Sequence, residues 1–437
     1  MKTIIAAVFG MAALGAFATT TISDVIVRQQ WPWNGKVNID YILHGDEGSQ
    51  HDISVTLRNG SSVITNEYGS LSGDLIGVTP GARRIVWDPA YNSPTYQDAL
   101  MVNFSASLST VEDDNTYMIV DLSGGASAAE YPVSFMSAPP AGGWTDEYKT
   151  DKLVLRRIPA GTAILGSPTD EIGRVDKYET QRKTIFTNSF YMAVFETTEK
   201  QFKNVMGYDP NVLANGHADT SPAICVDYLL LRGTNTVASS SSTSSSVWPG
   251  HEATSFFGVL NSKLPSTALS AAGLGDYEME LPTVSQWEFA CRAGTPGAWN
   301  NGTTITNATT DANAGLLACY GGASTVVPAV VGRKTPNAYG LYDMHGNVAE
   351  ICRDNVRYIY SDNYWDGSDQ IESLLHKTYP TGYASACIAR GGAYRSSTAS
   401  TVRAASSSEL TLGTYKLAPS SAENYKYGFR MVLTRKR

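Results

Sequence analysis

Residues 336–350 contain the densest group of motif residues in the chain, and they read PNAYGLYDMHGNVAE. Two carboxylates, Asp343 and Glu350, bracket the turn-forming pair Gly346-Asn347. Calcium prefers carboxylate and carbonyl oxygens as ligands, so this spacing is compatible with a calcium loop. The alternative is a structural loop in which Asp343 caps a turn and Glu350 pairs with an arginine.

Residues 390–403 form a second unusual stretch, RGGAYRSSTASTVR, which contains no acid, histidine or cysteine. Its paired glycines allow a close backbone approach or a positive φ. Its arginines, Arg390, Arg395 and Arg403, offer forked donors that suit carboxylates. The stretch is therefore either a functional site or the shell around one.

The length of 437 residues favours two or three domains rather than one. Hydrophobic residues make up 42% of the chain and charged residues 17%, which is typical of a globular protein with packed cores. The net charge of -8 disfavours nucleic acid as a partner, because phosphate binding needs a basic surface.

The first 18 residues are typical of a secretory signal peptide. Lys2 is followed by an apolar run over residues 4–17, and Ala16-Phe17-Ala18 matches the usual cleavage pattern. We therefore expect a secreted, periplasmic or cell-surface protein, with an uncleaved anchor as the alternative. No later apolar run approaches the ~20 residues that a spanning helix needs, so no membrane span is expected.

The five cysteines do not form a metal-binding or redox motif. They are Cys225, Cys291, Cys319, Cys352 and Cys387, and no two have C-x-x-C spacing. An exported protein can form disulfides, but the odd count leaves at least one thiol unpaired within the chain. Spacing does not give the connectivity; our preferred pair is Cys291 with Cys352, since each follows a predicted core segment.

Residues 19–140 predict a separate all-β domain. Apolar and polar residues alternate over 37–41 and 53–57, and Asn59-Gly60 is a strong hairpin signal. Similar short runs follow at 84–87, 101–108, 117–122 and 131–136. About seven short strands predict a β-sandwich of immunoglobulin or fibronectin type. No cluster of titratable residues stands out, which favours a structural or adhesive role.

Residues 138–143, APPAGG, contain a Pro pair and a Gly pair, which interrupt regular secondary structure. We therefore predict a linker at 141–152 and a second domain at 153–437. Capping boxes at Thr198-x-x-Gln201 and Thr283-x-x-Gln286 predict two helices, and residues 251–264 predict a third amphipathic helix. The serine-rich run 239–246 is interpreted as a loop insertion.

Six landmarks then occur in a fixed order across residues 153–435. They lie at 158–161, 195–198, 281–290, 339–348, 390–392 and 428–430. With these landmarks the domain resembles the formylglycine-generating enzyme, or sulfatase-modifying factor, family. The resemblance implies a compact α+β fold related to C-type lectins, and it does not include the first 140 residues.

The resemblance also implies calcium. One site would use Asp343, Gly346, Val348 and Glu350, the middle two through their backbone carbonyls. The family's second calcium site would use Asn313, Ala314, Gly332 and Lys334, where a carboxylate ligand of the family is replaced by glycine.

The family's enzymes hold copper(I) with two cysteines, five residues apart, that follow the Arg-Gly-Gly motif. The corresponding catalytic positions here are Ser396 and Thr401. Hydroxyls are hard ligands that do not hold copper(I) as thiolates do, so copper oxidase chemistry is not expected. The chain has no H-x-H, H-E-x-x-H or G-x-S-x-G motif either. A nucleophilic Ser396 would need a positioned base such as His217 or His345.

These observations predict a calcium-stabilised module that binds a peptide, an exported protein or a glycan. Its groove would include Arg390, Tyr394, Arg395, Ser396 and Arg403, with Arg395 and Arg403 anchoring an anion and Tyr394 as an apolar wall. The rival is a modifying oxidoreductase of the same family that acts on an exported protein such as a sulfatase. A third hypothesis is that the N-terminal domain mounts the module in a surface layer or complex.

Overall fold

The structure is a computed structural model. It describes residues 20–29, 37–46, 49, 51–59, 62–64, 71–74, 78–87, 100–108, 115–176, 179–210, 217–233, 250–322, 327–355, 370–371, 386–411 and 426–436. The predicted signal peptide and the predicted insertion at 239–246 lie outside these residues. The chain divides into two compact units at residue 113, with the short segments 159–162 and 185–188 grouped with the first unit.

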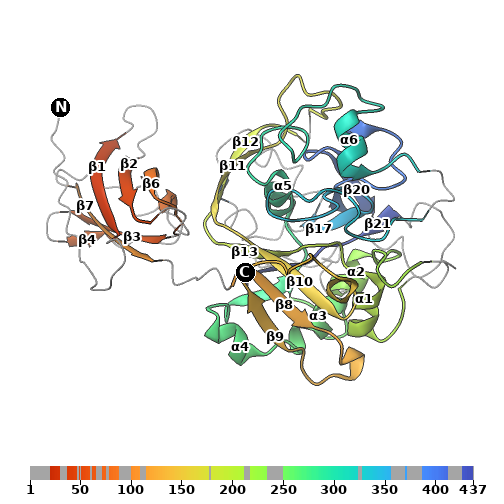
Figure 1. The fold of residues 1–437 in the computed structure, drawn as a ribbon. Helices are drawn as coiled ribbons and strands as arrows, with labels where there is room; N and C mark the ends of the chain where they lie inside the picture. Colours follow the sequence, from red (N-terminus) through yellow and green to blue (C-terminus); the bar gives the residue numbers. More distant parts are fainter. Residues whose placement is uncertain are drawn as a thin grey trace, which may run out of the picture. The chain divides into compact units, whose positions relative to one another are not determined.

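Antiparallel strands build the first unit. They are β1 (Thr21–Gln29), β2 (Val37–His44), β3 (His51–Asn59), β4 (Ser62–Ile64), β5 (Leu71–Gly73), β6 (Gly81–Trp87) and β7 (Leu100–Leu108). They form two sheets, in the orders β1-β2-β6-β5 and β4-β3-β7 (Figure 1). Both sheets contribute to one core, in which Ile39 of β2 and Leu57 of β3 are fully buried. Asn59 pairs with Ser62, which confirms the predicted hairpin. The immunoglobulin or fibronectin topology stays a prediction.

The predicted domain boundary at residue 140 is wrong. The strands β8 (Tyr117–Asp121) and β9 (Val133–Met136) pair with each other, and β8 pairs with β10 (Lys152–Ile158) of the second unit. The segment 141–152, predicted as a linker, therefore connects two elements of one sheet. Four consecutive residues of β8 are buried, as in a strand covered on both faces, whereas the strands of the first unit alternate.

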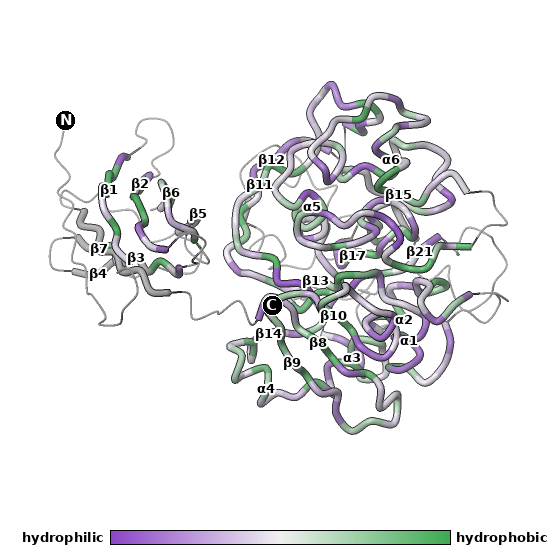
Figure 2. The backbone as a smooth tube through the Cα atoms, viewed as in Figure 1, coloured by the Kyte–Doolittle hydropathy of each residue, from purple (hydrophilic) through white to green (hydrophobic). Residues whose placement is uncertain are grey.

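A six-stranded antiparallel sheet runs through the second unit. Its order is β14-β22-β13-β10-β8-β9, where β13 is Phe190–Ala193, β14 is Tyr277–Glu280 and β22 is Val432–Arg435. Figure 2 shows hydrophobic residues along β8, β9 and β13. One face of the sheet packs into a large core with Leu153 and Leu155. The other face packs into a smaller aromatic core with Val154.

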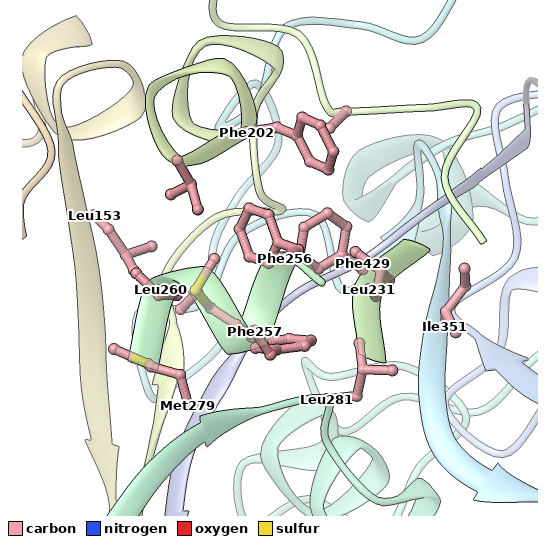
Figure 3. Packing of buried hydrophobic residues seen from close by; sticks show 14 of the residues in the cluster. Leu153, Phe202, Leu231, Phe256, Phe257, Leu260, Met279, Leu281, Ile351 and Phe429 are labelled. Atoms are coloured by element: carbon pink, nitrogen blue, oxygen red, sulfur yellow. The ribbon is translucent and has the colours of Figure 1, made fainter. Parts of the chain in front are cut away.

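Short helices cover the large core. They are α1 (Glu199–Met206), α2 (Tyr228–Arg232), α3 (Phe256–Ser262) and α4 (Ser266–Ala271). Two further helices, α5 (Val284–Arg292) and α6 (Ala312–Leu317), come later in the chain. Phe202 of α1 stacks on Phe256 of α3, whose ring meets Phe429 edge to face (Figure 3). Both predicted capping boxes form, at Thr198 and Thr283. The predicted helix over 251–264 is shorter, because the Ser255 side chain caps it at Phe256.

Smaller sheets complete the second unit. Their strands are β11 (Gly161–Leu165), β12 (Arg182–Phe186), β15 (Ala318–Cys319), β16 (His345–Gly346), β17 (Ala349–Asn355), β18 (Gln370–Ile371), β19 (Ala386–Arg390), β20 (Ser407–Thr411) and β21 (Tyr427–Gly428). The sheet β20-β19-β17-β21 brings the motif stretch 336–350 beside the stretch 390–403, because β17 follows the first and β19 precedes the second.

Neither Cys291 nor Cys352 forms a disulfide, so the preferred pairing of these two residues is wrong. Cys291 instead contacts the Met344 carbonyl oxygen, and Cys352 contacts the Glu350 carbonyl oxygen. No helix in the described part of the chain is long and apolar enough to cross a membrane.

Candidate functional site

Glu350 of β17 is held by a buried arginine. Its carboxylate accepts hydrogen bonds from Arg430, the shortest at 2.8 Å, and from the Trp287 indole nitrogen at 2.6 Å. Glu350 and Arg430 are almost fully buried. The alternative in which Glu350 pairs with an arginine is therefore confirmed.

Glu288 of α5 forms the second buried junction. It pairs with Arg292 at 2.8 Å and with Arg390 at 3.1 Å, and it accepts the Gly166 backbone N–H at 2.7 Å. Burial alone would raise the pKa of Glu288, but the surrounding arginines outweigh it and hold the pKa at about 2. Glu288 is therefore ionised, and Arg390 is a structural partner and not a ligand contact.

Asp343 lies close to a carboxylate that sequence reasoning missed, Glu196. Asp343 accepts the Gly332 N–H at 2.5 Å. Glu196 accepts the Asn347 side-chain amide at 2.5 Å and the Val348 N–H at 3.0 Å. Burial and the mutual repulsion of these carboxylates raise the pKa of Glu196. Burial also raises the pKa of Asp343, to about 6.

The stretch 390–403 is more deeply buried than predicted. Arg403 is 1% exposed and pairs with Glu179 at 2.9 Å and with Glu171. Tyr394 is buried, and the Arg395 guanidinium lies 5.5 Å from the centre of its ring. The prediction that Arg390, Tyr394 and Arg403 line an open groove is therefore wrong, because buried contacts already occupy all three side chains.

Two hydroxyls in this stretch are engaged in local turns. The Ser396 hydroxyl oxygen accepts the Ala393 N–H at 2.9 Å, and the Thr401 hydroxyl donates to the Thr398 carbonyl oxygen at 2.7 Å. Ser396 is half-buried and Thr401 is exposed. A nucleophilic serine would need a base at its hydroxyl, and no hydrogen bond to a histidine involves Ser396 in the described part of the chain.

The family model of the sulfatase-modifying factor enzyme 1-like domain matches residues 145–435. The chain belongs to this family. Of the solved structures, variable protein 1 of Treponema denticola is 22% identical, with a TM-score of 0.44, and the match covers 64% of this chain and 95% of that one. PvdO from Pseudomonas aeruginosa is 19% identical, with a TM-score of 0.42, over 64% and 94% of the two chains. No curated protein matches the chain.

The residues at the first calcium position of this sulfatase-modifying factor domain fit a cation only in part. Glu350 does not fit, because Arg430 and Trp287 already occupy its carboxylate and a cation would be repelled by Arg430. Asp343 and Glu196 do fit, since their buried carboxylates accept hydrogen bonds from neutral donors. Within the described residues, no group of three or more His, Cys, Asp or Glu side chains is arranged to hold a metal ion.

The second calcium position does not fit a cation. Lys334 donates from its ammonium group to the Gly315 carbonyl oxygen at 2.7 Å, directly beside Asn313 and Ala314. The Asn313 side-chain oxygen accepts a hydrogen bond from Asn301. A lysine ammonium therefore lies among the residues where the family would place the ion. The nearby carboxylate, Asp311, is already engaged, because it accepts hydrogen bonds from the backbone N–H groups of Asn313, Ala314 and Thr306.

His345 in the motif stretch has a structural role. Its Nδ1 lies 2.7 Å from the Val402 carbonyl oxygen, and its Nε2 accepts the Asn300 N–H at 3.2 Å. Burial lowers the pKa of His345 to about 4. A neutral imidazole therefore joins the segment around Val402 to the segment around Asn300.

Proposed function

We propose that the second unit is a binding module for an exported protein or a glycan, without the copper oxidase chemistry of its family. The observation that carries this proposal is the state of Ser396 and Thr401, whose hydroxyls are hydrogen-bonded within their own turns. A hydroxyl is also the wrong ligand type for copper(I). The nearest thiol in sequence, Cys387, is buried, and burial raises its pKa, which disfavours the thiolate.

The ligand surface would be the outer part of the stretch 390–403. Ser397 and Thr401 are exposed there, and Arg395, Ser396 and Thr398 are half-buried. Hydroxyl groups with one flanking guanidinium can exchange hydrogen bonds with peptide groups or sugar hydroxyls, both of which carry donors and acceptors.

A peptide that carries the sulfatase motif Cys-x-Pro-x-Arg tests this proposal. We expect binding without a change of peptide mass in the presence of copper(I). Introducing Ser397→Tyr should weaken the binding at least tenfold, whereas Ala253→Tyr, at an exposed residue outside this surface, should not. Conversion of the peptide, or stoichiometric copper in the purified protein, would instead support the oxidoreductase.

We further propose that calcium stabilises the module, held by Asp343 and Glu196 rather than by Glu350. Calcium would add positive charge beside two buried carboxylates, of which Glu196 has its pKa raised in part by the charge of Asp343. A chelator should lower the melting temperature of the wild-type protein and leave that of Asp343→Asn unchanged. An unchanged wild-type melting temperature would remove calcium from the proposal.

Export is part of the same proposal and rests on residues 1–18 of the sequence. Expression with and without these residues, followed by separation of the cytoplasmic and exported fractions, tests it. Equal retention of both forms in the cytoplasm would contradict it.

A further inference from the structure

Arg156 lies on the face of the six-stranded sheet that packs into the smaller aromatic core. Its register partner in β8 is Tyr117, which belongs to that core. The Arg156 guanidinium lies 5.0 Å from the centre of the Tyr117 ring. Trp144 is half-buried, and its ring centre lies 5.0 Å from that of Tyr117 in an edge-to-face arrangement.

Arg156 has no acidic partner among the described residues, in contrast to six arginines of this unit that pair with buried carboxylates. Buried carboxylates pair with Arg232, Arg292, Arg353, Arg390, Arg403 and Arg430. The only side-chain hydrogen bond of Arg156 among the described residues is a long one, 3.4 Å, which Nη1 donates to the Thr116 carbonyl oxygen. Its Nε is buried and has no hydrogen-bond partner in the same part of the chain. A buried, unsatisfied charged donor is costly, so its presence points to an absent partner.

Two phenol groups, those of Tyr117 and Tyr339, lie near this guanidinium, and a third, that of Tyr342, lies near Tyr117. The hydroxyls of Tyr117, Tyr339 and Tyr342 make no hydrogen bond within the described residues, and packing fixes each ring. Tyr342 stacks on Phe195 at 5.0 Å, Tyr339 lies 6.5 Å from Phe289, and a Cβ added at Gly340 would be 3.3 Å from the Tyr117 hydroxyl.

Electrostatics supports the proximity of these groups. Burial raises the pKa of Tyr117 and of Tyr339, and the positive charge of Arg156 opposes the rise at both residues. Tyr342 adds to the rise at Tyr117. The guanidinium of Arg156 and the neutral phenols of Tyr117 and Tyr339 therefore share one small region, with Tyr342 next to Tyr117.

We propose that Arg156, together with Tyr117, Tyr339 and Tyr342, binds a carboxylate whose apolar or aromatic substituent packs against Trp144. A planar carboxylate matches the guanidinium fork, and the phenols are further donors. One positive charge balances a monoanion better than a phosphate dianion. The neighbouring cations, Lys149 and Lys152, already pair with Asp146 and Glu147.

Calorimetric titration of the full chain with benzoate tests this site, with benzamide at equal ionic strength as the uncharged probe. We expect saturable binding of benzoate alone, weakened at least tenfold by Arg156→Gln. The matched control is Arg157→Gln, one residue along β10 and on the opposite face of the sheet, beside Tyr191. It should leave benzoate binding unchanged.

The variant Tyr339→Phe removes one donor without removing charge, so it should weaken binding less than Arg156→Gln does. Circular dichroism melting curves identify any variant that fails to fold. Four results would overturn the proposal: no saturable benzoate binding, equal binding of benzamide, an unchanged affinity in Arg156→Gln, or a preference for sulfate over benzoate.

Discussion

The two units stabilise their interiors in different ways. The first unit buries alternating apolar residues such as Ile39 and Leu57, and its ion pair between Asp40 and Arg84 lies at the surface. The second unit also buries apolar residues, but carboxylate–arginine pairs run through its centre, as at Glu350 and Arg430. Apolar burial tolerates small rearrangements, whereas a buried charge depends on one specific partner.

Removing one member of a buried pair should give the largest effect. The variant Arg430→Leu leaves Glu350 buried without its cation, so the second unit should lose about 3–5 kcal/mol of unfolding free energy. Hydrogen exchange followed by mass spectrometry would detect the loss in this unit alone. Arg435→Leu removes an arginine that is 36% exposed at its side chain and should change little. Equal effects of the two variants would contradict the comparison.

A cavity in the first unit should be nearly as costly. Ile39 is fully buried, so Ile39→Ala should cost about 2–5 kcal/mol. The same exchange measurement should show faster exchange in β2 and its neighbours and no change in the second unit. Ile26→Ala, at a residue that is 45% exposed, is the control and should stay within about 0.5 kcal/mol.

In calcium-free buffer, the second unit alone should lose stability as pH rises towards neutrality. The pKa of Asp343 is raised to about 6 in the folded protein, above its value of about 4 in the unfolded chain. Its contribution is therefore fully present below pH ~4 and is lost as pH rises through about 6. Urea melts across this range should show the slope, and Asp343→Asn should flatten it. An unchanged slope in that variant would assign the effect to another group.

The surface pair of the first unit should give the smallest effect. The Arg84 side chain is 55% exposed and lies 2.5 Å from Asp40. Asp40→Asn should therefore cost only about 0.2–1 kcal/mol, and the cost should fall with added salt. Urea unfolding at two salt concentrations measures it. A loss of unfolding free energy as large as that of Arg430→Leu would contradict the comparison, because a surface ion pair would then matter as much as a buried one.

Local patterns were predictable from the sequence, and long-range partners were not. Each capping box, at Thr198 and at Thr283, involves two residues only three positions apart, so the sequence alone predicted both helix starts. Arg403 pairs with Glu179, which lies more than 220 residues earlier in the sequence. No sequence periodicity predicts a contact between residues so far apart. Glu196 belongs to the family motif at residues 195–198, but its contact with Asn347, 151 residues later, follows only from the fold. The uninterrupted apolar run of β8, unlike the alternating strands before it, could have indicated from the sequence that β8 belongs to the second unit.

The position of β22 has a consequence for biosynthesis. This strand, residues 432–435, lies between β13 and β14, both of which are synthesised more than 150 residues earlier. Until it emerges from the ribosome, β13 and β14 each lack a neighbour, and their exposed edges can pair with other chains. A chaperone that shields these edges during translation would therefore raise the yield of this unit more than one that acts after release.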